Sequence, residues 1–264
     1  QQLACLQASL SIDNGAVNWL TAFFALDYAG LFEVLNKGFA TLELPIFLGG
    51  TSNHFRIEAL RAVGFWDAYN VTEDADLGLR LARAGFSVKT FRSFTREEAP
   101  EDLGALFRQR TRWLKGWMQT ALAHCRDPQQ LFEDLGPRGA FATLAMFASG
   151  FLAPLVGPPL TLVLVWRAVF GDLLQPADLF DHALATLWCS LALGGFVASF
   201  FPLLLGMQRA GLGKLASALL AEPLWRMMVS AAAWRALFEL HSQPFLWRKT
   251  EHGLARRVED APLN

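Results

Sequence analysis

Apolar runs along the chain are short in its first part and long in its second part. Residues 3–10 form a short apolar stretch, and residues 87–94 are rich in β-formers, so each predicts a strand. Residues 72–84 predict a helix, with a threonine as N-cap, acids in the first turn and a glycine just past its end. Residues 102–124 carry a second helical pattern. The first part is therefore predicted to be α/β.

Two long apolar segments, residues 141–165 and 183–207, follow in the second part. A transmembrane helix needs about 20 apolar residues to cross the hydrocarbon core, so both segments are predicted spans. Pro154, Pro158 and Pro159 lie in the first segment. They predict either a kink or a helical hairpin that does not fully cross.

Charges around the two segments predict their orientation. The link, residues 171–182, holds three aspartates but no Lys or Arg, whereas the outer flanks carry Arg138, Arg209 and Lys214. The positive-inside rule places the link outside and both flanks in the cytoplasm. Residues 215–240 include several charges and a proline, and we expect an interfacial or re-entrant helix there, followed by a cytoplasmic tail.

The composition supports a division into a domain, residues 1–138, and a membrane region, residues 139–264. Hydrophobic residues make up 53% of the chain and charged residues only 18%. This deficit of charge indicates that part of the surface faces lipid. The net charge of −1 provides no basic field for nucleic acid, so no nucleic-acid partner is expected.

Thr72-Glu73-Asp74 is the first candidate for chemistry. Acidic residues stabilise the first turn of a helix by opposing its dipole, which is the structural interpretation. The functional interpretation is that a carboxylate at a helix start, near a cleft, acts as general base for an acceptor hydroxyl.

Gln109, Arg112 and Trp113 are the second candidate, since in a helix they share one face. An aromatic ring stacks on a sugar or base, while Arg and Gln bind phosphate or hydroxyl oxygens. A compatible alternative is an interfacial helix that extends its cations to anionic lipid headgroups. These cations are Arg108, Arg110, Arg112 and Lys115.

Gly49 and Gly50 permit close approach of the backbone to a ligand, although a Gly-Gly pair is just as often a turn. His54 follows them and by itself is better interpreted as a structural histidine. The histidines of the chain form no ligand spacing, so no complete metal site is predicted in it.

The order of these motifs, with the apolar segments behind them, resembles the family-2 processive-type glycosyltransferases, which include cellulose synthase, hyaluronan synthase and a bacterial membrane branch with phage-adsorption-type proteins. The resemblance implies that Asp74 is the general base, with Glu73 beside it. It implies that Thr72 contributes to substrate binding.

The same resemblance assigns the second candidate group to substrate. Gln109, Arg112 and Trp113 would hold the acceptor sugar and the nucleotide diphosphate. Gly49 and Gly50 match the loop beneath the acceptor.

The implied fold is the C-terminal, acceptor-side part of a glycosyltransferase-A-like domain, Rossmann-like in its nucleotide-sugar binding, followed by a helical transmembrane region. The family's nucleotide-binding strand and Asp-x-Asp metal motif do not precede the motifs in this sequence. We therefore expect a fragment that is inactive alone. A divalent metal, Mg or Mn, is expected, with its ligands mostly outside the chain.

The expected function is inverting transfer of a sugar from a nucleotide-sugar donor to a glycan or lipid-linked acceptor. The expected location is the cytoplasmic face of the bacterial inner membrane, in a multi-pass protein in contact with membrane lipid. One alternative is a catalytically inactive adaptor or receptor component, for which intact motifs would be unnecessary. Another is a small transporter, which would have charged residues within its spans, and these segments have none.

The tail has two open interpretations. Some family members place a loop with Thr and Lys over the bound nucleotide, and Trp247, Lys249 and Thr250 are candidates for it. The alternative is a basic tail on the membrane surface.

Overall fold

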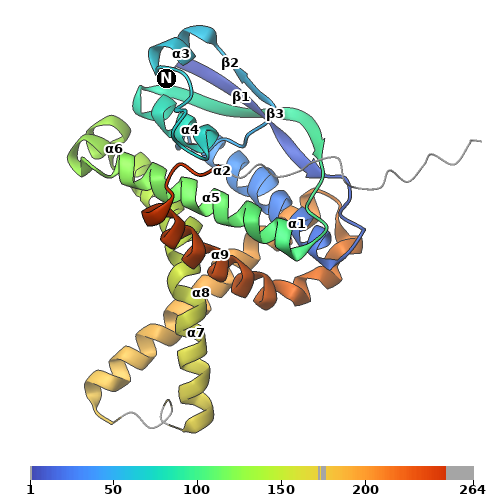
Figure 1. Ribbon diagram of the computed structural model, residues 1–264, viewed down its shortest axis with the longest axis vertical. Coiled ribbons are helices and arrows are strands. Elements are labelled where there is room, and N and C mark those ends of the chain that lie inside the picture. Colours follow the sequence, from blue (N-terminus) through green and yellow to red (C-terminus); the bar gives the residue numbers. More distant parts are fainter. Residues whose placement is uncertain (1, 172, 174–176, 248–264) are drawn as a thin grey trace, which may run out of the picture.

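The computed structural model describes residues 2–171, 173 and 177–247. It has a small sheet, helices packed against it and a long helical pair that projects away from this body (Figure 1). The strands are β1 (Gln2–Ile12), β2 (Asn53–Phe55) and β3 (Phe86–Glu97). The helices of the body are α1 (Trp19–Ala29), the π-helix η1 (Gly30–Leu35), α2 (Asn36–Thr41), α3 (Ile57–Ala62), α4 (Glu73–Arg83) and α5 (Leu103–His124). The later helices are α6 (Pro128–Phe147), η2 (Ala148–Leu152), α7 (Ala153–Phe170), α8 (Leu179–Arg209), η3 (Gly213–Ala221) and α9 (Glu222–Ser242).

The sheet has the order β2-β1-β3, with β2 antiparallel and β3 parallel to the central strand β1. Both predicted strands are confirmed, and each is longer than its apolar run. The central strand buries side chains on both of its faces, as apolar runs in parallel pairs do. The described chain is otherwise mostly helical, and the mixed sheet forms one layer in the upper part of the body in Figure 1.

The predicted helix at the Thr-Glu-Asp motif is confirmed, but the predicted cap is wrong in its chemistry. Thr72 occupies the N-cap position, yet its side chain makes no capping hydrogen bond. Its hydroxyl lies 3.4 Å from Asn70 Oδ1 and is packed against α5. Tertiary packing has therefore replaced the local cap. Gly85 follows the helix with a φ of 80°, as expected for a glycine after a helix end.

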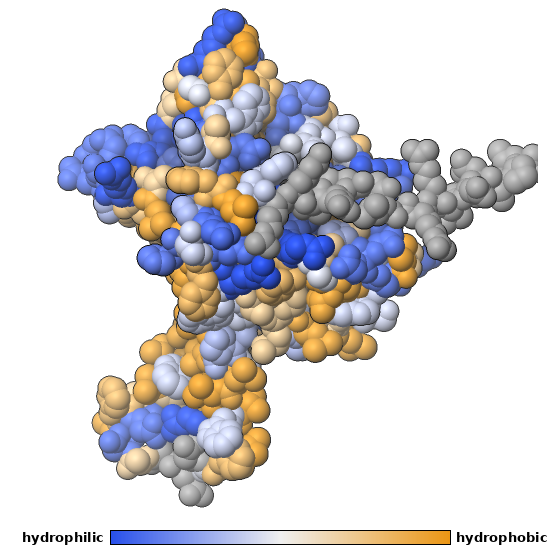
Figure 2. Space-filling model, viewed as in Figure 1, coloured by the Kyte–Doolittle hydropathy of each residue, from blue (hydrophilic) through white to orange (hydrophobic). Residues whose placement is uncertain are grey.

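Two helical runs are long and apolar enough to cross a membrane by length and composition: Pro128–Phe170, of 43 residues, and Leu179–Arg209, of 31 residues. Their outer parts, α7 and the first half of α8, form the projecting pair, and its surface is largely apolar (Figure 2). Arg167 and Asp181 join the two helices near their outer ends, with both carboxylate oxygens 3.0 Å from one guanidinium nitrogen.

Of the two alternatives for the first apolar segment, a kink or a helical hairpin, the hairpin does not form. The chain bends instead at Gly136, whose φ of 65° interrupts α6, and then continues through η2 into α7. Pro154 stands in the first turn of α7, directly after the π-helical turn. A proline lacks an N–H and its ring displaces the carbonyl four residues earlier, and a widened turn accommodates both effects. Pro158 and Pro159 lie within a continuous helix.

The region predicted as an interfacial or re-entrant helix is η3 and α9. η3 runs along α1, and α9 packs lengthwise against α5 (Figure 1). Ala232, Ala233 and Ala236 are fully buried in the α5–α9 contact. Small residues let the two helices approach closely. The position of α9 relative to a membrane stays a prediction.

Candidate active site

Asp74 lies in the first turn of α4, half-buried, with Oδ1 accepting a hydrogen bond of 2.8 Å from the Ala75 N–H. Burial raises the pKa of Asp74 to about 6. The Ala75 hydrogen bond and the Arg112 cation oppose this rise, and the Glu73 carboxylate adds to it. A carboxylate with a pKa near 6 can hold and release a proton close to neutral pH, which suits a general base.

Gly50 borders the same carboxylate. A Cβ built on Gly50 would lie 3.2 Å from Asp74 Oδ2, a tight contact, so the lack of a side chain at position 50 helps the loop backbone to approach the acid. Gly49 is packed as tightly, with a Cβ position 3.2 Å from the Phe32 ring. The two glycines therefore form a backbone floor beside Asp74, whereas Glu73 points to solvent.

A buried amide network holds this glycine loop. Gln7, on β1, donates to the Gly49 carbonyl and to Asn53 Oδ1, at 3.5 and 3.1 Å. Its own Oε1 accepts from Asn36 Nδ2 at 3.2 Å. Because Gln7 is fully buried, these bonds are made without competition from water. The loop position is thus fixed by the central strand.

Gln109 and Arg112 lie on α5, and Arg112 faces the loop that precedes the Thr-Glu-Asp motif. Arg112 Nη1 donates to the Val71 carbonyl at 3.2 Å. Within the described part of the chain, Arg112 Nε and Gln109 Oε1 are buried and have no hydrogen-bond partner. Burial lowers the pKa of Arg112, and the Asp74 and Glu73 charges oppose this. Unpaired buried polar atoms are costly, so this part of α5 carries hydrogen-bonding capacity that the described residues do not use.

Trp113 belongs to an aromatic wall rather than standing alone on the helix. It stacks on Tyr28 with ring centres 6.3 Å apart, and Phe24 lies at 6.2 Å. The Arg110 guanidinium is 5.0 Å from the Trp113 ring and bonds Asp27 at 2.6 Å.

Two of the four cations of this helix, Arg110 and Lys115, are bonded inside the protein and are not available to lipid headgroups. Arg110 is occupied by Asp27 and by aromatic rings. Lys115 is 1% exposed, and its ammonium donates to the carbonyls of Gln243 and Leu246 at 3.2 and 2.8 Å. Both cations are therefore structural.

The loop before α4 is locked to α5. Asn70 donates to Thr120 Oγ1 at 2.9 Å, and Gln119 accepts from the Val71 N–H at 3.1 Å. A Cβ built on Gly116 would lie 2.1 Å from Thr72 Oγ1. The two sequence motifs thus form one rigid unit, although Asp74 and Gln109 are 35 positions apart in the chain.

Asp76 extends this unit away from the site through a buried polar chain. Its two carboxylate oxygens bond His124 Nε2 at 2.9 Å and Arg80 Nε at 2.7 Å. The other His124 nitrogen, Nδ1, lies 3.1 Å from Arg83 Nη1, and Arg83 pairs with Asp134 at 2.7 Å. Because arginine can only donate, Nδ1 accepts, so the histidine proton sits on Nε2 and points at Asp76.

Asp74-Ala75-Asp76 is therefore not a metal motif, since both oxygens of Asp76 are already bonded to protein. Among the described residues, no group of three His, Cys, Asp or Glu side chains could hold a metal ion. The expected divalent metal, with its ligands mostly outside the chain, stays a prediction.

The chain after α9 lies beside both motifs. Gln119 donates to the Pro244 carbonyl at 3.0 Å, and the Phe245 ring meets Tyr69 edge-on at 5.6 Å. Trp247 follows with its side chain more than half exposed. Lys249 and Thr250, the other predicted members of the nucleotide-covering loop, lie outside the described residues.

The sequence did not point to Tyr28, Asp27 or Gly116, and it did not predict that Lys115 is buried. A signal for the aromatic wall is present, because Phe24, Tyr28 and Phe32 follow each other at intervals of four and so share one helical face. Gly116 is seven residues, or two helical turns, after Gln109, so the spacing places both on one face of the helix. No local signal marks Lys115 as buried.

Comparison with known proteins gives matches to glycosyltransferases. A beta-monoglucosyldiacylglycerol synthase of Synechocystis sp. is 29% identical over 181 residues, 65% of this chain and 35% of the relative. A poly-beta-1,6-N-acetyl-D-glucosamine synthase of Staphylococcus epidermidis is 26% identical over 98 residues, 37% of this chain and 24% of the relative. A probable glycosyltransferase of Sulfolobus acidocaldarius is 33% identical over 84 residues, 32% of this chain and 18% of the relative.

The matched part of the chain thus spans about a third or less of these relatives' own length. The family described as Glycosyl transferase family group 2 matches residues 1–247, which include the carboxylate, the glycine loop, the α5 face and both apolar helical runs. The chain belongs to glycosyl transferase family group 2.

Proposed function

We propose that this chain forms the acceptor side of an inverting glycosyltransferase that moves a sugar from a nucleotide-sugar donor to a hydroxyl of a glycan or lipid-linked acceptor. The observation that carries the proposal is Asp74, a half-buried carboxylate with a pKa of about 6. It stands between a backbone floor and the cation of Arg112.

In the proposed reaction the acceptor hydroxyl lies over Gly50 and hydrogen-bonds Asp74. Asp74 takes the hydroxyl proton while the acceptor oxygen forms a bond to the anomeric carbon. The bond from that carbon to the diphosphate oxygen breaks on the opposite face, and the nucleoside diphosphate leaves with the electron pair. Attack opposite the leaving group inverts the anomeric configuration.

The α5 face supplies the remaining interactions. Arg112 offsets negative charge on the departing diphosphate, and the unpaired Gln109 Oε1 accepts from a sugar hydroxyl. Trp113 and Tyr28 form an aromatic surface on which the acceptor ring stacks. We further propose that residues other than those described hold a divalent metal. The proton transfer and the bond changes proposed here do not require it.

We also propose that α7 and α8 insert into the cytoplasmic membrane of a bacterium, with the catalytic body in the cytoplasm. The long apolar side chains of the projecting pair are mostly exposed, for example Val169 at 70% and Leu179 at 86%. Exposed apolar surface on this scale is not stable in water and is suited to hydrocarbon. The α7–α8 pair is too small for a polymer pore, so export would need further helices.

The segment after α9 supports a nucleotide-covering loop at this site. Lys115 and Gln119 hold residues 243–246 beside the Thr-Glu-Asp loop, which brings Trp247 to the substrate side. Replacement of Lys249 by Ala would then weaken donor binding. Unchanged donor affinity would favour the basic membrane-surface tail.

The test of the catalytic proposal is nucleotide-sugar turnover by the full-length parent protein and its Asp74→Asn variant. The asparagine keeps the shape of the side chain but cannot take the proton, so turnover should fall by about 100-fold or more. Thermal unfolding of both proteins shows whether the fold is kept. Equal turnover in a folded variant would refute Asp74 as the base.

A further inference from the structure

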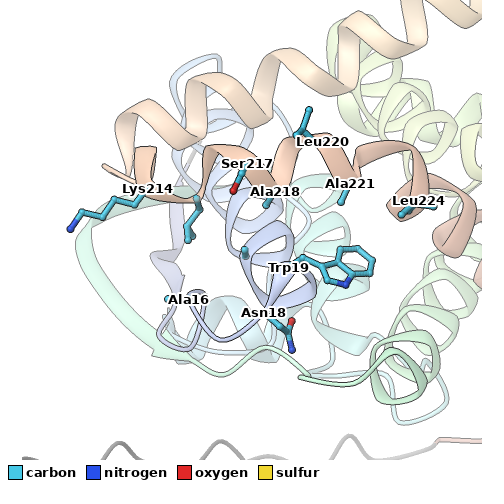
Figure 3. Close-up of a pocket in the computed structure, with 12 residues that line it drawn as sticks. Ala16, Asn18, Trp19, Lys214, Ser217, Ala218, Leu220, Ala221 and Leu224 are labelled. Atoms are coloured by element: carbon cyan, nitrogen blue, oxygen red, sulfur yellow. The ribbon is translucent and has the colours of Figure 1, made fainter.

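A groove of about 550 Å³ lies between the start of α1 and η3, outside the candidate active site (Figure 3). Its apolar side chains include Trp19, Ala22, Leu220 and Leu224, and its polar ones include Lys214 and Ser217. In Figure 3, Lys214 stands at one end and Leu224 at the other.

The groove is separate from the candidate active site. Trp19 and Ala22, at the start of α1, line it, whereas Tyr28, near the end of the same helix, belongs to the aromatic wall beside Trp113. A helix rises about 1.5 Å per residue, so Trp19 and Tyr28 are about 14 Å apart along α1. A ligand in the groove would not occupy the acceptor position.

The walls of the groove expose large apolar side chains. Trp19 is 45% exposed, Leu224 63% and Leu220 87%. Ala22 and Ala218 are small and buried, and they form the floor over the aromatic core of the body. Apolar groups gathered at the rim of a hollow indicate an occupant with an apolar part.

The polar end of the groove is cationic. Lys214 is exposed, and among the residues that the structure describes it has no ion-pair partner. Asn18 at this end is held in place, because it caps α1 by accepting from the Thr21 N–H and donates one amide N–H to the Glu101 carbonyl. The Lys214 ammonium and the Ser217 hydroxyl together suit a phosphate oxygen.

The groove directly follows an apolar helix in the chain. α8 ends at Arg209 and η3 begins at Gly213, so only residues 210–212 separate the helix from the groove. If α8 spans the bilayer, its end lies at the depth of the lipid headgroups. Lysine and tryptophan are enriched at this depth, where a charged or polar group meets hydrocarbon.

We propose that this groove binds one anionic membrane lipid. The phosphate lies at Lys214 and Ser217, and the glycerol and upper acyl chains lie along Trp19, Leu220 and Leu224. The proposal rests on the membrane attachment proposed above, and it is independent of the catalytic assignment.

The test uses the full-length parent protein in nanodiscs of phosphatidylglycerol and phosphatidylcholine, with retained lipid identified by native mass spectrometry after release. We expect preferential retention of phosphatidylglycerol, and a loss of about fivefold in this preference in Lys214→Gln, since one interfacial lysine contributes about 1 kcal/mol. Lys89→Gln, an exposed lysine on β3, is the matched control and should behave as wild type.

A photo-crosslinking residue at position 220 identifies what lies in the groove. Crosslinks to lipid acyl chains support the proposal, and crosslinks to another protein overturn it. Unchanged lipid preference in Lys214→Gln also overturns it. Failure of the membrane attachment itself would be recognised separately, because the wild-type protein would then stay soluble without detergent.

Discussion

Thr72 and Gly116 lie so close together that position 116 has no room for a side chain. A Cβ on Gly116 would be 2.1 Å from the threonine Oγ1 and 2.7 Å from its Cγ2. Thr72 precedes the acidic pair on α4, and Gly116 belongs to the helix that carries Gln109 and Arg112. This contact sets the distance between the proposed base and the proposed substrate-binding face.

Gly116→Ala should therefore separate the two motifs. A glycine-to-alanine change in a helix by itself stabilises by about 1 kcal/mol, but the clash should reverse the sign and cost about 1–3 kcal/mol. We expect a lower thermal midpoint and at least a tenfold loss of turnover. Gly38→Ala in α2 is the control, because a Cβ there meets nothing within 4 Å. A Gly116→Ala protein with wild-type turnover would contradict this role of the contact.

Asp74 should give the pH–rate profile a lower limb near pH 6. The base must be deprotonated, so turnover should rise through the Asp74 pKa of about 6 and then level off. Glu73→Gln removes a negative charge that raises this pKa, so the midpoint should move to lower pH. Arg112→Gln removes a cation that lowers it, so the midpoint should move to higher pH. Identical midpoints in all three proteins would exclude Asp74 as the titrating group.

Asp76 and His124 should stabilise the fold above pH 4 and less so below. Burial alone raises the pKa of Asp76, but the hydrogen bonds from His124 and Arg80 lower it overall from 3.8. A depressed folded-state pKa means that the contribution is present above the unfolded value and is lost as the pH falls through the folded value. The thermal midpoint of the wild type should therefore fall between pH 7 and pH 3, and this fall should be smaller in Asp76→Asn.

His124→Phe tests the hydrogen bond between His124 and Asp76 without changing the Asp76 carboxylate. It leaves a buried Asp76 oxygen without its donor, which should cost about 1–3 kcal/mol at pH 7. His241→Phe, at the end of α9, is the exposed control. Equal thermal midpoints for His124→Phe and wild type would contradict the assignment of the Nε2 proton to Asp76.

The elements that depend on local residue types were predicted from the sequence. β1 follows from a short apolar run, β3 from β-forming residues, the helix after Thr72 from its acidic first turn and the glycine past its end, and the two apolar helices from their long apolar runs. The sequence did not predict that Arg110 and Lys115 are internal, because their partners, Asp27 and Leu246, are 83 and 131 residues away. Charge on a helix indicates a solvated face by default, and only the packed fold shows which cations are satisfied inside.

Lys115 should control the segment that leads to Trp247. Its ammonium is bonded to the Gln243 and Leu246 carbonyls and lies 3.7 Å from Glu239. Lys115→Met keeps the length of the side chain but removes the donors, so residues 243–247 should be released. Limited proteolysis should then cut this segment faster than in wild type, and donor affinity should fall if the segment covers the nucleotide. An unchanged cleavage rate would show that other contacts hold it.

Gly206 should transmit changes in the apolar helices to the active site. A Cβ on Gly206 of α8 would lie 2.5 Å from the Gly30 nitrogen, where α1 passes into η1, two residues after Tyr28. Gly206→Ala should force the helices apart and shift Tyr28 from its stacking on Trp113, lowering turnover several-fold and raising the acceptor KM. Gly195→Ala, in the same helix with nothing within 4 Å, should be silent. If both variants match wild type in the reconstituted full-length protein, α8 anchors the body without influencing the site.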